Sequence, residues 1–259
     1  MAEKRVLWTK EELILAFNLY LKIEFGKTHA SNPRIIELGN LMGRTPASIV
    51  MRLGNFASID PYHQNRGVGG LKNGTNQVQP IWDEFFTNQE ELIFRSEQIL
   101  AERQHLSIED KYVDLLSDLK DVKGETKLRL VKTRVNQSVF RQIVLNNYSS
   151  KCAVTGIDIP DLLFASHILP WSKHEKERLN PENGICLSAL YDRAFDKGYI
   201  AFDRNYKVLL SSSLKNKKDS EYYAQHFAPI ADKLIRQPVK YYPNQLFLEQ
   251  HRDTIFDKK

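Results

Sequence analysis

The chain has 259 residues, of which 42% are hydrophobic and 27% are charged. These proportions are ordinary for a folded globular protein and exclude a collagen-like chain, a wholly disordered chain and a coiled coil throughout. The net charge of +5 permits a polyanionic partner such as DNA without requiring one.

The sequence also bears on location. No apolar run approaches the about 18–20 residues that span a bilayer, and residues 1–13 lack the apolar core of a secretory signal. Two cysteines, Cys152 and Cys186, are too few for a disulfide scaffold or a four-cysteine zinc site. We therefore expect a cytoplasmic protein with reduced thiols, no membrane association and no structural zinc.

Residues 1–86 are expected to form a helical domain. Helix-start signals, in which a capping residue is followed by a residue suited to the first turn, occur at Thr9 with Glu12, Asn32 with Pro33, and Thr45 with Pro46. Gly43 can end the second of these helices. The sequence therefore predicts two helices that flank the short turn 43–45.

That turn gives the region a helix-turn-helix outline. In DNA-binding proteins of this outline the second helix enters the major groove. Arg44, Arg52 and Asn55 would then be outward-facing polar residues of a target-recognition domain, and such side chains suit contacts to base edges. A purely structural helical domain is the alternative.

Residues 87–123 keep a helical pattern and are expected to connect this domain to a second one at 124–259. The second domain begins with a basic helix, roughly Lys127–Tyr148. The stretch Gly124–Arg141 carries five basic residues and one acid; the basic residues are Lys127, Arg129, Lys132, Arg134 and Arg141. They would hold DNA phosphates, and the alternative is an ordinary solvated helix face.

The second domain then reads as a mixture of short strands and helices. Strands are expected at Leu162–Leu169 and Gly184–Leu187, a helix at Ser188–Asp196, a hairpin within 198–211, and further helices at Ser220–Ala228 and Ile230–Arg236. The whole chain is therefore expected to be α+β.

His167 differs from the other histidines because it lies inside an apolar strand pattern. Asp192 follows it on a predicted helix, and a polar loop lies between them. The other six, which show no partner at ligand spacing, are His29, His63, His105, His174, His226 and His251. A strand histidine, a loop asparagine and a helix carboxylate form the three corners of a ββα nuclease site; a buried core histidine is the alternative.

Such a site has a clear chemical logic. A neutral imidazole with a pKa near about 6.5 can take a proton from water at physiological pH. A divalent cation opposes the charge on the phosphate, and Mg²⁺ prefers oxygen ligands such as an Asp carboxylate. The pattern therefore favours a Mg²⁺ or Mn²⁺ cofactor.

Several segments together resemble the HNH endonucleases, in particular the branch found in bacterial restriction enzymes, including McrA-type enzymes that attack modified DNA. The segments are Cys152–Gly156, Leu163–Trp171, Arg178–Leu187 and Tyr191–Gly198, and the resemblance extends over residues 124–203. It implies that His167 activates water, that Asn183 fixes the loop, and that Asp192, with His167 as a further candidate, ligates the metal.

The sequence departs from this family in places. Ser166 stands where many members carry a second metal ligand, so the ion would be held by fewer protein groups. Tyr191 stands where relatives place His and could bind a phosphate or pack. Asp196 could cap the end of its helix or act as an accessory ligand.

The function implied by the resemblance is metal-dependent hydrolysis of DNA in restriction or phage defence, with a homodimer favoured if both strands are cut. Two alternatives remain open from the sequence. One is a non-cleaving DNA-binding regulator with a degenerate nuclease domain, and the other is a nuclease effector or toxin that is directed to its target by a protein interaction.

Overall fold

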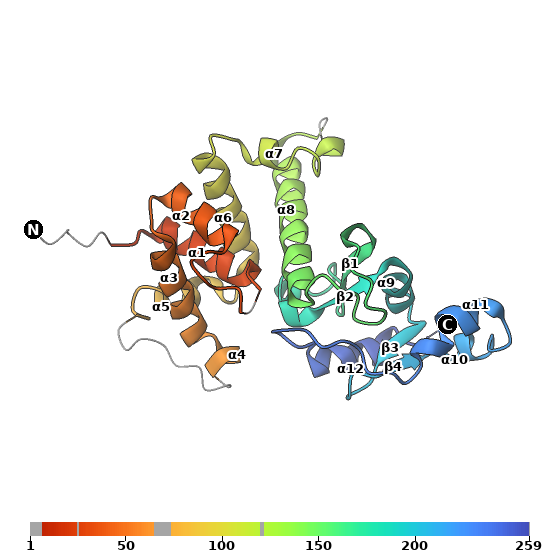
Figure 1. Ribbon diagram of the computed structural model, residues 1–259. Helices are drawn as coiled ribbons and strands as arrows, with labels where there is room; N and C mark the ends of the chain where they lie inside the picture. Colours follow the sequence, from red (N-terminus) through yellow and green to blue (C-terminus); the bar gives the residue numbers. More distant parts are fainter. Residues whose placement is uncertain (1–6, 25, 65–73, 120–121, 259) are drawn as a thin grey trace, which may run out of the picture. The chain divides into compact units, whose positions relative to one another are not determined.

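The computed structural model describes residues 7–24, 26–64, 74–119 and 122–258 (Figure 1). It divides into two compact units, Met1–Val139 and Phe140–Lys259, called here the helical unit and the C-terminal unit. The dividing point lies inside one long helix, α8 (Gly124–Asn147). The boundaries predicted from the sequence lie earlier, after residues 86 and 123.

The helical unit consists of helices and short turns. Its elements are α1 (Lys10–Lys22), α2 (Pro33–Met42), α3 (Pro46–Ile59), α4 (Pro61–Gln64), α5 (Gln79–Phe85), α6 (Gln89–Arg103), α7 (Ile108–Lys111), a 3₁₀ turn at Ser117–Leu119 and the first part of α8 (Figure 1). Helix α1 contacts α3 and α6, and α2 contacts α3.

The predicted helix starts are confirmed. The Thr9 hydroxyl accepts from the Glu12 backbone N–H at 3.2 Å, and the Glu12 carboxylate accepts from the Thr9 N–H at 2.7 Å. Asn32 and Thr45 cap α2 and α3, each followed by a proline in the first turn. Gly43 ends α2 with a φ of 64°, in the left-handed region that glycine tolerates best.

The core of the helical unit is aromatic. The ring of Phe17 stacks on Phe56 with centroids 4.7 Å apart and on Trp82 at 5.1 Å, and all three side chains are buried. Rings of this size supply much of the apolar area that holds a small helical core together. A second cluster forms around Leu116, Leu119, Val131 and Val135.

One polar group lies deep in this unit. The Glu97 side chain is 2% exposed, and its carboxylate pairs with the ammonium groups of Lys22 and, at 2.9 Å, Lys111. It also accepts from the Tyr112 hydroxyl at 2.8 Å. Burial opposes ionisation, but the two lysines outweigh it and lower the pKa of Glu97 to about 2.

The C-terminal unit begins with the rest of α8 and is built on two hairpins. Its elements are β1 (Leu163–His167), β2 (Gly184–Ser188), α9 (Ala189–Asp196), β3 (Ile200–Phe202), β4 (Val208–Leu210), α10 (Ser212–Lys215), α11 (Glu221–His226) and α12 (Gln245–Thr254), with 3₁₀ turns at Pro160–Leu162, Glu175–Glu177, Pro181–Asn183 and Ala228–Ile230.

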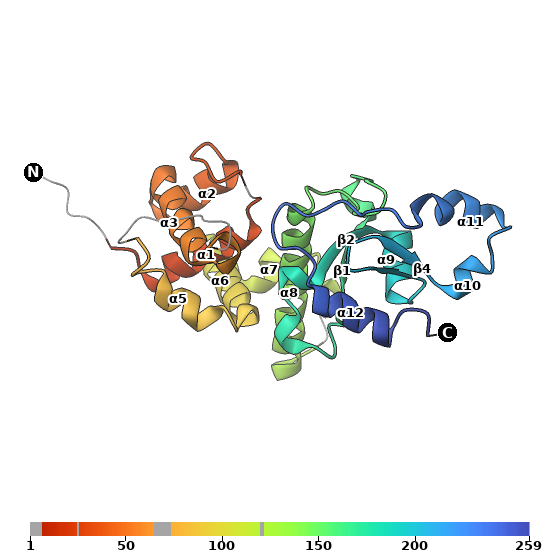
Figure 2. The same cartoon turned by 90° about the horizontal axis from the view of Figure 1, so that it is seen from below.

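Strands β1 and β2 pair antiparallel, from Leu163 opposite Ser188 to His167 opposite Gly184. Helix α9 packs on both strands, and β3 pairs with β4 in a separate sheet (Figure 2). The α+β class is confirmed, as are the strands and the helix expected around positions 162–196.

One prediction for the end of the chain was wrong, and one helix there was not predicted. Residues 230–236 do not form an α-helix, because Asp232 has a φ of 58° and the segment bonds along β4, where the Val208 N–H donates to the Lys233 carbonyl. Helix α12 was missed, although Asn244 caps it and Leu248 and His251 are buried at helical spacing.

Candidate active site

The site lies where β1 ends and β2 begins. His167 is the last residue of β1 and faces Gly184 across the ladder. A Cβ atom on Gly184 would come within 2.4 Å of Val144 and 2.9 Å of Phe140, both on α8. Glycine is therefore required here, because it lets the helix approach closely enough for Phe140 to reach the histidine ring.

The imidazole of His167 is fixed on two sides. Its ring stacks on Phe140 with centroids 4.0 Å apart and meets Trp171 edge-on at 5.3 Å. Nε2 lies 2.9 Å from the backbone carbonyl oxygen of Arg178. A carbonyl only accepts, so the neutral ring carries its proton on Nε2, and Nδ1 keeps the lone pair. Burial lowers the pKa of His167, although the Arg178 carbonyl opposes this, so the ring is neutral at physiological pH.

Asn183 holds the loop between the two strands. Its side chain is fully buried. Oδ1 accepts from the Leu169 N–H at 2.7 Å, while Nδ2 donates to the Leu169 carbonyl at 3.2 Å and to the Glu177 carbonyl at 2.9 Å. This amide therefore ties both ends of the loop together, and it lies away from the reacting groups.

Ser166 and Asp192 form a pair. The Ser166 hydroxyl is buried and donates to Oδ1 of Asp192, which projects from α9. The hydroxyl therefore orients the carboxylate instead of standing in the position of a ligand. This contact gives Ser166 a positive role that the sequence did not reveal.

His167, Ser166 and Asp192 line one cleft of about 370 Å³. The other polar side chains in its wall are Asp196, Lys197 and His251, and Trp171 supplies apolar surface. The structure thus brings together four of the predicted site residues, namely Ser166, His167, Asp192 and Asp196. It adds two that the sequence did not indicate, Lys197 and His251.

Asp196 lies one turn after Asp192 on α9. Its carboxylate makes no hydrogen bond or ion pair within the described residues, so the expectation of a helix-end cap was wrong. Desolvation and then the neighbouring Asp192 charge raise the pKa of Asp196. Two like charges one helical turn apart are an arrangement that a cation relieves.

The donor set suits a hard divalent ion. Mg²⁺ is commonly held by one or two carboxylates, with waters and substrate phosphates completing its shell. Asp192 and Asp196 match that need. Over the described part of the chain, no group of three or more His, Cys, Asp or Glu side chains could hold a metal ion, so two carboxylates would have to share the shell with water.

Tyr191 faces away from this chemistry. Its hydroxyl donates to the His226 carbonyl at 2.6 Å, and its ring packs edge-on against Phe227. The side chain is buried and does not line the cleft. Of the two expectations for Tyr191, packing is therefore the one that the structure supports, and phosphate binding was wrong.

Both cysteines are buried, Cys186 within β2 and Cys152 next to it. The Cys152 sulfur accepts from the N–H groups of Ser188 at 3.2 Å and Thr155 at 3.5 Å. Although burial opposes ionisation, these contacts lower the pKa of Cys152, while burial raises that of Cys186 to about 12. Cys152 thus organises the turn 152–155 through its sulfur.

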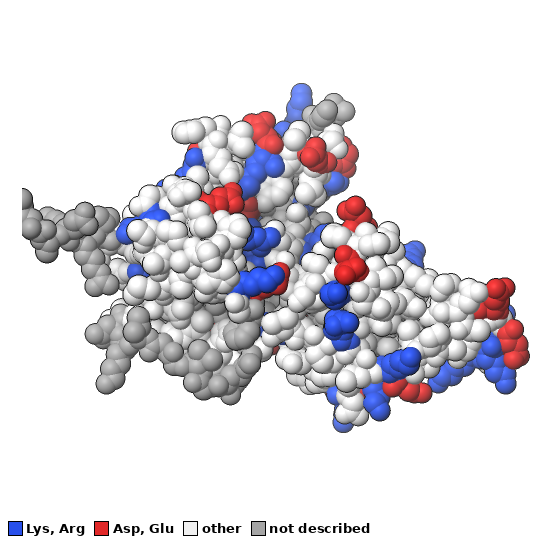
Figure 3. All heavy atoms as spheres, viewed as in Figure 1, with Lys and Arg blue, Asp and Glu red and all other residues white. Residues whose placement is uncertain are grey.

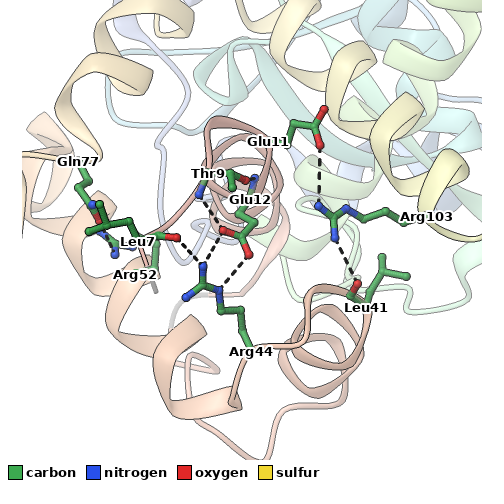
Figure 4. A network of polar contacts seen from close by, with 9 residues as sticks. All are labelled: Leu7, Thr9, Glu11, Glu12, Leu41, Arg44, Arg52, Gln77 and Arg103. Atoms are coloured by element: carbon green, nitrogen blue, oxygen red, sulfur yellow. Dashed lines mark hydrogen bonds and ion pairs between the residues drawn. The ribbon is translucent and has the colours of Figure 1, made fainter. Parts of the chain in front are cut away.

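Arg44, expected to face outward, is instead an internal residue. Its guanidinium donates to the Glu12 carboxylate through Nε at 2.9 Å and Nη2 at 2.8 Å, and also to the Leu7 carbonyl (Figure 4). Its side chain is 14% exposed. The expectation was wrong because Glu12, which caps α1, presents a carboxylate that attracts the arginine inward.

The side chains of Arg52 and Asn55 also make their contacts within the helical unit. Arg52 donates to Gln77 at 2.9 Å (Figure 4), and it lies over the Trp8 ring at 4.7 Å. Asn55 is buried, and Gly74 packs against its side chain. The exposed face of α3 carries Met51 instead. The helix-turn-helix outline is present, but its predicted outward polar face is not.

The basic residues of α8 fall into two groups. Lys132 pairs with Glu91 at 2.7 Å, Arg134 pairs with Asp118, and Arg141 donates to the Pro160 carbonyl at 2.7 Å. Lys127 and Arg129 make no such contact in the described regions. On the face shown in Figure 3, basic and acidic side chains are interspersed.

Residues 152–203 match the family described as HNH endonuclease, so the chain contains an HNH endonuclease domain in this segment. The matched segment includes β1, β2 and α9 with His167, Asn183 and Asp192, and it ends before α12. No curated protein matches the chain. In the described residues, no helix is both long and apolar enough to span a membrane.

Proposed function

We propose that the protein is a metal-dependent endonuclease that hydrolyses phosphodiester bonds of DNA in the cleft beside His167. One observation carries this proposal. The Arg178 carbonyl fixes the proton of His167 on Nε2, which leaves Nδ1 as the proton acceptor of a ring that lines the same cleft as two neighbouring carboxylates. A general base beside a carboxylate pair is what hydrolysis of a phosphodiester needs.

The proposed step begins with a water molecule in the cleft. Nδ1 of His167 accepts a proton from it, and the water oxygen forms a new bond to phosphorus. The bond from phosphorus to one ester oxygen breaks, and that oxygen leaves with a proton from solvent. Because the ring is clamped between Phe140 and Trp171, Nδ1 has a fixed direction when the water arrives.

Asp192 and Asp196 would hold the divalent cation, Mg²⁺ or Mn²⁺. A bound cation would offset the negative charge that builds up on the phosphate and on the leaving oxygen. Ser166 keeps the Asp192 carboxylate turned to the cleft. Asn183 serves as a scaffold by closing the loop, and His167 is assigned to the base, not to the ligand shell.

The DNA backbone would be held by basic side chains both in the cleft and beyond it. Lys197 lines the cleft, and Lys127 and Arg129 lie on α8 without an internal partner among the described residues. We place the protein in the restriction-type, McrA-like branch and infer a defence role that selects modified DNA. The sequence resemblance supports that branch, and double-strand cutting with one centre per chain would favour a homodimer.

The alternative of a non-cleaving DNA-binding regulator loses its main support. It rested on Ser166 as a lost ligand and on Arg44, Arg52 and Asn55 as base readers. Ser166 orients Asp192, and the other three side chains are held within the helical unit. Nothing in the structure favours the targeted toxin either.

A plasmid-cleavage assay tests the proposal. Wild type and His167→Ala are compared with Mg²⁺, Mn²⁺ and EDTA on unmodified, cytosine-methylated and hydroxymethylated DNA. We expect cutting that needs the metal and is lost by about 100-fold or more in the variant. Metal-independent binding without scission on every substrate would overturn the nuclease and restore the regulator.

A further inference from the structure

Helix α12 lies beyond the matched segment yet is built against it. It packs beside β3 (Figure 1), and Arg252 donates to the Phe202 carbonyl at 2.6 Å. The Asp257 N–H donates to the Gly198 carbonyl at 3.0 Å. Gly198 has a φ of 71°, and a Cβ there would lie 2.1 Å from the Ile255 carbonyl oxygen. The C-terminal segment is therefore fitted closely to the turn that follows α9.

On α12, the residue His251 contacts Phe195 of α9. It is 1% exposed, and its ring lies flat on Phe195 with centroids 3.9 Å apart and an interplanar angle of 2°. Nε2 lies 3.1 Å from the Phe195 carbonyl oxygen. That oxygen can only accept, so the imidazole is the donor and carries its proton on Nε2.

The bonded carbonyl belongs to the last turn of α9. It also accepts from the Gly198 N–H at 2.9 Å, while the Tyr199 N–H donates to the Ala194 carbonyl at 2.8 Å. This pair of backbone bonds is the Schellman ending of a helix. His251 adds a side-chain donor to it, so both acceptor directions of the Phe195 oxygen are used.

The same turn carries the acids of the cleft. Asp196 directly follows Phe195, and Asp192 lies one turn earlier. Their charges repel each other, and Asp196 lies at the helix end where the dipole is also unfavourable to a carboxylate. A hydrogen bond from another helix adds to the backbone bonds that hold this turn and its two carboxylates.

The ring of His251 also stays neutral. Burial lowers its pKa to about 4, with Arg252 adding to the effect and the Phe195 carbonyl opposing it. A neutral ring adds no positive charge to a cleft that would bind a cation. Its Nδ1 is buried and has no hydrogen-bond partner in the described structure.

We propose that His251 is a positioning residue of the cleft, which holds the last turn of α9 and so keeps Asp192 and Asp196 together for one divalent cation. Only the use of that cation in DNA cleavage rests on the proposed function. The support itself is a property of the fold and can be measured on the full chain without DNA.

The test compares variants that separate the hydrogen bond from packing. His251→Phe keeps a ring against Phe195 and removes the donor, whereas His251→Gln keeps an N–H donor of similar reach. Leu248→Ala is the matched control, because it removes a buried side chain of the same helix that has no hydrogen-bonding group. Each full-length variant is titrated with Mn²⁺, and unbound Mn²⁺ is read by electron paramagnetic resonance.

We expect His251→Phe to weaken Mn²⁺ binding by about tenfold, the usual cost of losing an outer partner of a metal site. His251→Gln should restore most of it, and Leu248→Ala should leave it unchanged despite a lower melting temperature. Amide hydrogen exchange at residues 194–199, measured without metal, should become faster in His251→Phe alone. Equal Mn²⁺ affinity and equal exchange in wild type and His251→Phe would overturn the proposal.

Cleavage of plasmid DNA distinguishes a failure of the proposed nuclease activity from a failure of the positioning role of His251. If the wild type binds Mn²⁺ but cuts no DNA, the proposed nuclease fails, and the affinity series still decides the role of His251. If the wild type cuts and His251→Phe cuts with the same metal dependence, the nuclease stands and the positioning role fails.

Discussion

The two units use their acidic side chains in opposite ways. In the helical unit, Glu12 is held by Arg44, and Glu97 is held by two lysines. In the C-terminal unit, Asp192 accepts from a neutral hydroxyl, and Asp196 has no partner in the described part of the chain. The first pair of acids is ion-paired with basic side chains, whereas the second pair makes no ion pair within the described residues.

The pKa shifts follow the same division. Although burial opposes ionisation in both, the basic partners hold the pKa of Glu12 below its usual value and that of Glu97 at about 2. Desolvation and a like charge raise the pKa of Asp196. Charge that a fold leaves unmatched in a cleft marks a binding site, whereas matched charge belongs to stability.

The largest effect is expected from Asp192→Asn. This change removes one carboxylate from the cleft, and we expect cleavage to fall by at least about 100-fold. The melting temperature should not fall, because the repulsion with Asp196 is also removed. Single-turnover cleavage and thermal unfolding measure both. If Asp192→Asn lost activity only because it unfolds, the difference between the acids of the two units would be contradicted.

Glu97→Gln should lower stability without affecting the cleft. It leaves Lys22 and Lys111 without their buried partner, which costs on the order of 3 kcal/mol in the free energy of unfolding. Urea denaturation measures this loss, and Mn²⁺ binding at the cleft should stay as in wild type. Glu84→Gln is the control, since its pair with Lys10 is exposed and contributes less than about 1 kcal/mol.

Lowering the pH should destabilise the C-terminal unit first and the helical unit later. The pKa of His251 is depressed from about 6.5 to about 4, mainly by burial, so the unfolded chain binds the proton more readily, and stability falls as pH drops through that interval. Glu97 contributes stability that is present above about 4.5 and is lost toward about 2. The raised pKa of Asp196 partly offsets the loss of stability that comes from His251.

Hydrogen exchange at pH 7, 5 and 3 measures this order. We expect protection to fall first in the C-terminal unit and later in the helical unit. His251→Gln should flatten the first loss, because it removes the titrating ring. Simultaneous loss of protection in both units would contradict the assignment of the two pH ranges.

The smallest effect concerns DNA contacts. Replacing Lys127 and Arg129 by Gln should lower the slope of log K against log salt concentration by about two, since each phosphate contact contributes about 0.9. Arg44→Gln should leave that slope unchanged and lower stability instead. Fluorescence anisotropy with labelled duplex at several salt concentrations measures the slope. A lower slope for Arg44→Gln would show instead that Arg44 contacts DNA.

Local signals in the sequence were sufficient for much of the fold. The caps at Thr9, Asn32 and Thr45 act within one helical turn, so the sequence reveals them directly. The strand around His167 and the helix of Asp192 carry clear hydrophobic patterns. Arg44 was placed on the wrong side because its partner, Glu12, lies on another helix, and no local pattern shows such a pairing.

The candidate site was predictable in part for the same reason. The motif supplied His167, Asn183 and Asp192, and the roles assigned to them stay predictions. His251 could not be recognised, because it reaches Phe195 across 56 positions of the chain. Its signal was weak but present, namely a cap at Asn244 followed by Leu248 and His251 at helical spacing.

In the proposed mechanism, Nδ1 of His167 takes the proton from water. The most direct test is single-turnover cleavage by His167→Gly with and without added imidazole, at constant Mg²⁺. We expect a loss of about 100-fold or more and a recovery that rises with the concentration of neutral imidazole, which can occupy the space beside Phe140. Cleavage by His167→Gly at the wild-type rate would contradict it.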